Sequence, residues 1–177
     1  KERWQSLAEC AALEMQYGPR SSGVQIPPSP PKTMKEYRQL TRSDFDHEMA
    51  LKTRWGDMDA LGHLNHVKYL TYMENARIAY YSSLGFGDLR HNQKPSIILG
   101  GMRIEYLSQV SHPADVYICH RINRIGKKSF DFLGAIFEEG KDLPVCTGLF
   151  KIISFDYKNQ KSVQVPQIIR ENLHKGL

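Results

Sequence analysis

The sequence predicts an α+β fold in which one long buried helix packs against a curved antiparallel sheet of about five strands. Three observations support this prediction. The run 67–85, VKYLTYMENARIAYYSSLG, is apolar on almost every side, which is typical of a helix surrounded by protein. One strand-like segment precedes this run, and four more follow it between short turns. A sheet built from such consecutive strands can bury the helix only by curving around it.

The segment 47–55, HEMALKTRW, alternates apolar with more polar positions and predicts a half-buried strand that begins the domain. In the helical run that follows, Glu74 and Arg77 are the main polar interruptions. Gly85 stands just past the expected helix, where glycine commonly ends helices because it adopts left-handed backbone angles. We therefore expect the helix to end immediately before Gly85.

The four later strands are expected at residues 96–110, 114–125, 129–139 and 144–157. Gly100 and Gly101 favour a bend or bulge in the first of them. The last two strands each place a row of residues on one face: Phe130, Phe132, Gly134 and Ile136 in one, and Thr147, Leu149, Lys151, Ile153 and Phe155 in the other. Turns at His112-Pro113, Gly126-Lys127-Lys128 and Gly140-Lys141-Asp142 predict that consecutive strands are antiparallel neighbours.

Residues 1–46 differ from the rest of the chain. Their first part has apolar residues at helical spacing up to Gly18-Pro19, and a stretch with four prolines between Pro27 and Pro31 follows. We expect an N-terminal arm over 1–46, one domain over 47–157, and a tail over 158–177 with a short helix.

The composition excludes several classes of protein. No window approaches the roughly 18 consecutive apolar residues of a transmembrane helix. Three cysteines without CxxC spacing argue against a disulfide framework. The net charge of +5 comes from scattered basic residues without an aromatic-basic motif, so we expect no nucleic-acid partner. A basic chain that starts without methionine is compatible with removal of a targeting peptide. We therefore expect the mitochondrial matrix, with the cytoplasm as the alternative.

One stretch, WGDMDALGHLNH at residues 55–66, places two carboxylates, two imidazoles and an amide immediately before the long helix. The start of a helix presents unpaired backbone N–H groups and the positive end of the helix dipole. A carboxylate held beside such donors can attack a carbonyl or deprotonate water, while the donors stabilise the oxyanion. The stretch therefore predicts acyl-transfer chemistry.

The longer segment 54–77, RWGDMDALGHLNHVKYLTYMENAR, resembles the signature of hotdog-fold acyl-CoA thioesterases of the 4-hydroxybenzoyl-CoA thioesterase type. The family pattern is Asp-x-Asp, then Gly-His-x-Asn, a tyrosine near the first helical turn and an acidic residue one turn further on. The resemblance covers roughly residues 47–157 and implies a hotdog fold. It also implies hydrolysis of a CoA thioester to free acid and CoA, with CoA as part of the substrate and no further cofactor.

The resemblance also implies roles for individual residues. Asp59 falls where the family places its catalytic carboxylate, as nucleophile or as general base. The amides after Gly62 fall where the thioester carbonyl is polarised. His63 is either part of the catalytic site or a buried histidine bonded to backbone. Asn65 either orients Asp59 or water, or caps the helix.

Other positions are more open. His66 stands where relatives more often have a second asparagine. Asp57 is expected to be a turn residue bonded to local amides, with a catalytic role as the alternative. Glu74 either forms an internal ion pair with Arg77 or lines the pocket. Tyr69 and Tyr72 are expected to line the site or a subunit contact.

A basic turn, RIGKKSF, offers a place for the nucleotide phosphates of CoA. The residues clustered around it are Arg121, Arg124, Lys127, Lys128 and Ser129, of which the last four are our predicted CoA-binding residues. The alternative is that the turn is only a solvated surface.

Two further classes of function are alternatives to an enzyme. The spacing of Asp57, Asp59, His63 and His66 matches no common metal loop, so no metal site is expected. The serious alternative is a non-catalytic hotdog subunit of a larger assembly, because fold does not determine function. In either case we expect a homodimer or homotetramer, since one sheet cannot cover a helix that is apolar all round.

Overall fold

The computed structural model of the protein describes residues 34–85 and 96–175. Its helical elements are α2 (Met34–Tyr37), η1 (Arg42–Asp44), η2 (Trp55–Asp57), α3 (His66–Ser83) and α4 (Gln167–Glu171). Its strands are β1 (His47–Lys52), β2 (Ser96–Tyr106), β3 (Asp115–Ile125), β4 (Ser129–Glu138), β5 (Cys146–Asp156) and β6 (Lys161–Ser162). The helical spacing before Gly18 and the proline-rich stretch after it lie outside the described residues.

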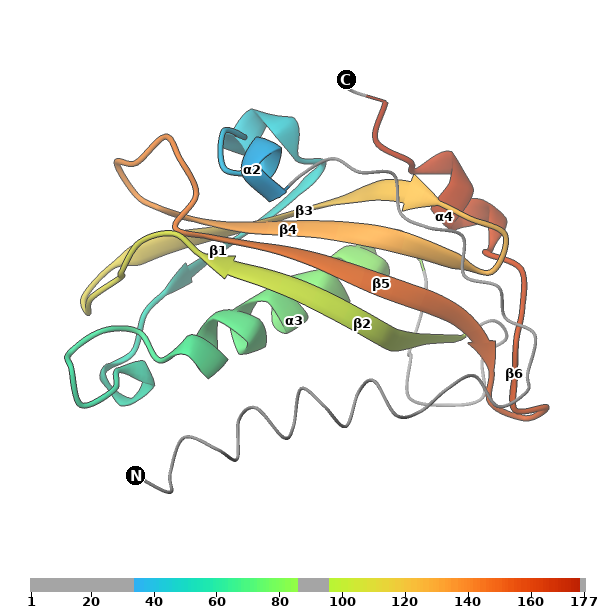
Figure 1. Ribbon diagram of the computed structural model, residues 1–177, viewed down its shortest axis with the longest axis horizontal. Coiled ribbons are helices and arrows are strands. Elements are labelled where there is room, and N and C mark those ends of the chain that lie inside the picture. The colour runs from blue at the N-terminus through green and yellow to red at the C-terminus, as the bar shows by residue number, and fades with distance from the viewer. Residues whose placement is uncertain (1–33, 86–95, 176–177) are drawn as a thin grey trace, which may run out of the picture.

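The strands form one antiparallel sheet in the order β1-β3-β4-β5-β2, and β6 pairs with the end of β5. Figure 1 shows this curved sheet with α3 along its inner side. The predicted fold class is therefore confirmed. The register of β2 against β5 shifts between Leu99 and Gly101, which confirms the bulge expected at the glycine pair.

One expected strand pairing is wrong. The turn at His112-Pro113 predicts that β2 and β3 are neighbours, but β2 pairs with β5 at the far edge of the sheet. Three strand spacings, roughly 14 Å, separate β2 from β3. The connection over residues 107–114 is long enough to cross that distance. Local sequence cannot distinguish such a crossing from a hairpin.

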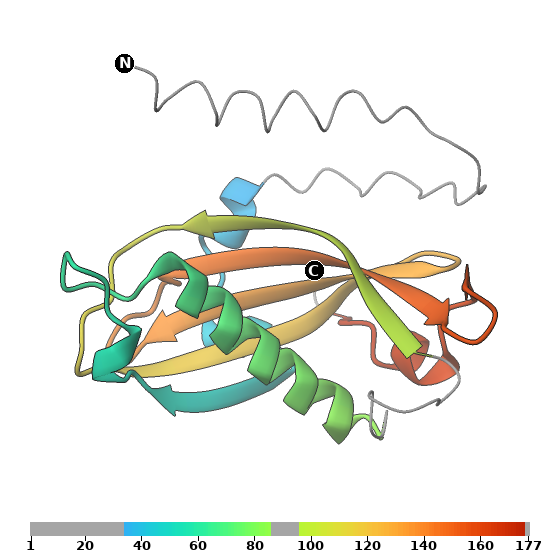
Figure 2. The same ribbon diagram turned by 90° about the horizontal axis from the view of Figure 1, so that it is seen from below.

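Helix α3 begins and ends where its sequence indicates. Asn65 is its N-cap residue, and its side-chain Oδ1 accepts a hydrogen bond from the Val67 amide at 3.0 Å. At the other end, Gly85 has a φ of +75°, which is strained for residues with a side chain. Figure 2 shows the helix lying diagonally across the sheet.

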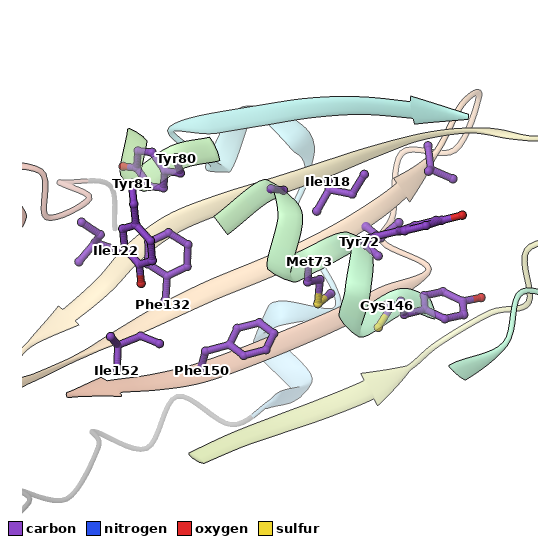
Figure 3. Packing of buried hydrophobic residues seen from close by; sticks show 14 of the residues in the cluster. Tyr72, Met73, Tyr80, Tyr81, Ile118, Ile122, Phe132, Cys146, Phe150 and Ile152 are labelled. Carbon is purple, nitrogen blue, oxygen red and sulfur yellow. The ribbon is translucent and has the colours of Figure 1, made fainter. Parts of the chain in front are cut away.

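The core lies between α3 and the inner face of the sheet (Figure 3). Tyr80 and Tyr81 of the helix pack on Phe132, with ring centroids 5.3 Å apart in both pairs. Met73 has no exposed surface. The helix is not buried all round within one chain, however, because Val67 and Ile78 are 51% and 46% exposed.

Residues 36–46 pack on the outer face of the sheet, opposite α3, as Figure 1 shows for α2. Tyr37 and Leu40 are buried against Leu133. Phe45 packs edge-on against Phe137 with ring centroids 5.9 Å apart. These contacts are those of a folded unit, so we place the start of that unit near Met34 rather than at the expected His47.

The predicted short C-terminal helix is present as α4, and it belongs to the core. Ile169 has no exposed surface and joins the main hydrophobic cluster. Leu173 forms a β-bridge with Ile122, and the His174 amide donates to the Ile122 carbonyl at 3.0 Å. The folded unit therefore continues past residue 157.

Candidate active site

The loop between β1 and α3 is a compact turn that holds Asp59 in place. Met58 and Leu64 form an antiparallel bridge, and the Asp59 amide donates to the His63 carbonyl at 2.8 Å. The Gly62 amide donates to the Asp59 carbonyl at 3.0 Å, and Gly62 has a φ of +77°. Gly62 thus serves the turn, because its left-handed backbone would strain any residue with a side chain.

The carboxylate of Asp59 is half-buried and partly engaged. Its Oδ1 accepts from the Leu61 amide at 2.8 Å and from the His63 amide at 3.4 Å. These bonds orient the carboxylate, while Oδ2 makes no hydrogen bond within the described residues. The second oxygen is therefore available to a substrate or a water molecule.

Most backbone amides expected to polarise a carbonyl are already used. The amides of Leu64, Asn65, Val67 and Lys68 donate to Val110 O, Asp57 O, Asn65 Oδ1 and Asn65 O, respectively. No hydrogen bond in the described part of the chain uses the His66 amide, which is the first of α3. The free donor at the helix N-terminus is therefore that of His66.

Asp59 and His66 border the same open cleft, which has a volume of about 340 Å³. This volume falls within the usual range for small-molecule sites, about 300 to 1,000 Å³. The cleft is lined by Asp59, Leu61, His63, Leu64, His66, Tyr69, Tyr106, Leu107, Ser108 and Gln109. The structure thus brings together three of the predicted catalytic residues: Asp59, His63 and Tyr69.

The wall formed by residues 106–109 was missed by the sequence reasoning. The segment 96–110 was expected to be one strand, but β2 ends at Tyr106 and the chain then turns along the cleft. Ser108 and Gln109, polar residues between Leu107 and Val110, are the local signal that the strand pattern stops there.

Tyr69 is a buried residue of α3 that lines the cleft beside residues 106–109. Its ring meets Tyr106 edge-on with centroids 5.4 Å apart, and its hydroxyl donates to the Ser108 carbonyl over 3.5 Å. Burial raises the pKa of Tyr69 to about 12, so it remains a neutral phenol at physiological pH. Tyr106 in turn donates from its hydroxyl to the His66 carbonyl at 3.1 Å.

Asp57 does not have the role expected of it. Its carboxylate does not bond to local amides but is buried against α3. Tyr72 donates its hydroxyl to Oδ2 at 2.6 Å, and the ammonium of Lys68 lies 2.9 Å from Oδ1. The hydrogen bond from Tyr72 and the charge of Lys68 hold the pKa of Asp57 below its usual value despite burial. It is Asp59 that bonds to local amides.

The other three predicted catalytic residues, Gly62, Asn65 and Glu74, do not line the cleft, and Gly62 serves the turn. Asn65 caps helix α3, which is one of the two roles that the sequence predicts for it. Glu74 lies on the exposed face of α3, with its carboxylate 4.0 Å from the guanidinium of Arg77. It is not among the residues that line the cleft within one chain.

The basic turn lies at the opposite end of the sheet from Asp59. The Asp59 loop follows β1, whose end lies beside the start of β3, as the hydrogen bond from the Thr53 amide to Ala114 O at 2.9 Å shows. Lys127, in contrast, follows the end of β3. The eleven residues of that strand span roughly 33 Å. One chain therefore cannot bring the turn to its own cleft.

Several of the residues predicted to bind the CoA phosphates already have partners within the chain. Arg124 pairs with Asp131 at 2.7 Å, and Ser129 is buried. Arg121 is buried as well and donates to the Asp44 carbonyl at 2.8 Å. Lys127 and Lys128 are the more accessible basic groups of the turn. We therefore restrict the predicted contact with the CoA phosphates to these two residues.

Two further properties concern the described residues, 34–85 and 96–175. They contain no group of three or more His, Cys, Asp or Glu side chains placed to hold a metal ion. None of their helices is long and apolar enough to cross a membrane.

Comparison with known proteins places the chain in a family. Residues 53–173 match the profile of the Thioesterase-like superfamily. Among curated proteins, the uncharacterised protein YsmA of Bacillus subtilis (strain 168) is 23% identical over 135 residues, which cover 76% of this chain and 90% of YsmA.

Two solved structures illustrate the likeness. The PA2801 protein of Pseudomonas aeruginosa, assigned as a thioesterase, is 30% identical with a TM-score of 0.65, over 71% of this chain and 95% of that one. A thioesterase of Thermus thermophilus, solved with coenzyme A and Zn, is 24% identical with a TM-score of 0.63, over 72% of this chain and 97% of that one. With its curved sheet, its single long helix and a family match over residues 53–173, this chain belongs to the thioesterase-like superfamily.

Proposed function

We propose that the protein is an acyl-CoA thioesterase of the 4-hydroxybenzoyl-CoA thioesterase type, with Asp59 as its catalytic carboxylate. The observation that carries this proposal is that Asp59 and His66 border one cleft, and that the His66 amide, the first of α3, makes no hydrogen bond within the described residues. The CoA bound to the Thermus thermophilus thioesterase supports a CoA thioester as the substrate.

The reaction uses the two groups in different ways. The His66 amide, at the positive end of the α3 dipole, donates to the thioester oxygen, and this hydrogen bond strengthens as the oxygen becomes an oxyanion. Removing one such donor typically costs about 3 kcal/mol of transition-state stabilisation. The His63 amide, held only over 3.4 Å by Asp59, is a second candidate donor.

Asp59 supplies the attack by one of two routes. As a general base, it takes a proton from water while the water oxygen adds to the thioester carbon. Collapse of the oxyanion then breaks the carbon–sulfur bond, and CoA leaves as a thiolate that takes up the proton. As a nucleophile, Asp59 itself displaces the thiolate to form a mixed anhydride, which water then hydrolyses. Both routes yield the free acid, CoA and a regenerated carboxylate.

The proposal includes association of the chain with a second copy of itself. Within the described residues no strand pairs with the outer edge of β2. Its exposed apolar side chains include Leu99 and Met102, which are 44% and 53% exposed. Val67 and Ile78 on α3 are similarly exposed. Burying these groups against a second copy removes apolar surface from water, and only such a copy can bring Lys127 and Lys128 near the cleft.

The test is thioester hydrolysis by the purified full chain. A panel of aromatic and aliphatic acyl-CoA substrates, followed with a reagent that detects the CoA thiol, should show turnover for at least one acyl class. Calorimetric titration with free CoA should show binding. A chain that neither hydrolyses any member of the panel nor binds CoA would overturn the proposal and favour the non-catalytic subunit.

A further inference from the structure

Asp57 is a buried carboxylate near the cleft with a partner on each oxygen, although it does not line the cleft. It is 7% exposed and accepts the Tyr72 hydroxyl at 2.6 Å, while Lys68 lies at 2.9 Å from its other oxygen. A buried carboxylate is retained without large loss of stability only when both its oxygens are paired in this way. The pairing therefore calls for an explanation beyond packing.

The partners of Asp57 lie on one side of α3. Lys68 and Tyr72 are four residues apart and so project from the same face of the helix, over its first two turns. The main chain of Asp57 makes a third connection, because its carbonyl accepts the amide of the cap residue Asn65 at 2.9 Å. Asp57 thus binds the start of α3 through both its side chain and its backbone.

The loop that Asp57 connects to the helix carries Asp59 two residues later. From Met58 to Leu64 this loop is closed on itself by its own bridge and turn. It therefore moves largely as one body, and its position relative to α3 depends on its ends. The carboxylate of Asp59 and the amide of His66 must keep a fixed spacing to act on one carbonyl, and an error near 1 Å can lower rates about 100-fold.

We propose that Asp57 is a positioning residue, whose carboxylate, bound between Tyr72 and Lys68, sets the spacing between Asp59 and the N-terminus of α3. This inference rests on the proposed function for its effect on rate. Its structural part, that the bond to Tyr72 restrains the loop, is independent of any activity.

The experiment compares three single variants. Tyr72→Phe removes one hydroxyl and keeps the ring, and Asp57→Asn keeps an acceptor for Tyr72 but loses the charge that pairs with Lys68. Tyr80→Phe is the matched control, because Tyr80 is another buried tyrosine of α3 that lies two turns away and packs on Phe132 instead. A purely structural contribution of the Tyr72 hydroxyl would lower the unfolding midpoint of Tyr72→Phe and leave its kcat unchanged.

Two measurements distinguish the roles. Tyr72→Phe and Asp57→Asn should each lower kcat about 10-fold to 100-fold and leave KM within about 2-fold, whereas Tyr80→Phe should leave both nearly unchanged. Amide hydrogen exchange at Leu61 and His63, which donate to Asp59, should accelerate in the first two variants and not in the control. The double variant should lose less kcat than the product of the two single losses, because both residues act through the same carboxylate.

Equal behaviour of all three variants in kcat and in exchange would overturn the positioning role. Faster exchange without loss of kcat would also overturn it. Should the wild-type chain hydrolyse no thioester, the proposed function fails, and exchange alone decides whether Asp57 restrains the loop.

Discussion

The imidazole of His120 lies directly against the backbone of Gly134, where a Cβ atom would stand 2.7 Å from Nε2. The two residues are partners across β3 and β4, and the ring packs on Phe132 with centroids 5.1 Å apart. His120 has no exposed surface, and neither ring nitrogen has a hydrogen-bond partner within the described residues. Gly134 therefore makes room for a buried, neutral histidine.

This burial predicts acid sensitivity. Desolvation lowers the pKa of His120 well below its ordinary value, and the nearby charge of Arg77 and the neighbouring His47 add to the effect. The folded state thus binds fewer protons than the unfolded one, so stability is complete above the unfolded pKa of about 6.5 and falls as pH decreases below it. The free energy of unfolding should fall by up to about 1.4 kcal/mol per pH unit from this group alone.

Denaturant unfolding of wild type and His120→Gln between pH 7 and pH 5 checks this prediction. His47 titrates in both proteins, so its contribution cancels in the difference. Glutamine does not titrate, and the stability difference between the two proteins should therefore shrink as pH falls. A difference that stays constant would contradict the prediction.

The arm should divide into two parts with different effects on stability. Deleting residues 1–33 should leave the unfolding midpoint nearly unchanged. Deleting residues 1–46 should destabilise the protein by several kcal/mol, since it uncovers Leu133 and Phe137 and removes the acceptor of Arg121. Thermal unfolding of both truncated chains tests this, and equal stability would return the boundary to His47.

Asp59→Asn should lower kcat by at least about 10² to 10⁴ while keeping the fold, because the amide is nearly isosteric but cannot take a proton or attack. The circular dichroism spectrum and the unfolding midpoint should remain close to wild type, since Asn can still accept the Leu61 amide. Asp142→Asn, an exposed carboxylate outside the cleft, is the control. Full activity of Asp59→Asn would show that another group supplies the attack.

Replacing Lys127 and Lys128 by alanine should raise KM for CoA thioesters and leave kcat largely unchanged. Phosphate binding far from the carbonyl stabilises substrate and transition state equally, which is the reason for this division. A short thioester without the nucleotide is the control substrate, and its KM should not change. Equal losses with both substrates would place the CoA phosphates elsewhere.

Self-association should depend on the edge strand. Light scattering of the wild-type chain at micromolar concentration should show at least a dimer. Leu99→Lys should weaken the association, because it places a charge on the exposed apolar edge of β2. Ile168→Lys, at a half-exposed position on α4, should not. A wild-type monomer would remove the two-copy proposal.

The sequence by itself determined the elements whose signals are local. The apolar run before Gly85, the cap at Asn65 and the glycine pair in β2 each correspond to an observed helix end or bulge. Such features arise from backbone angles and from bonds between residues close in the chain, so they can be predicted without tertiary contacts.

Only the tertiary structure decided which distant segments meet. The pairing of β2 with β5, the packing of residues 36–46 on the outer face and the entry of residues 106–109 into the cleft all depend on contacts between residues far apart in the chain. The same reason separates the two aspartates. Their spacing in the motif is that of a turn. Tyr72, 15 residues after Asp57, binds the buried carboxylate of Asp57, whereas Asp59 lines the cleft.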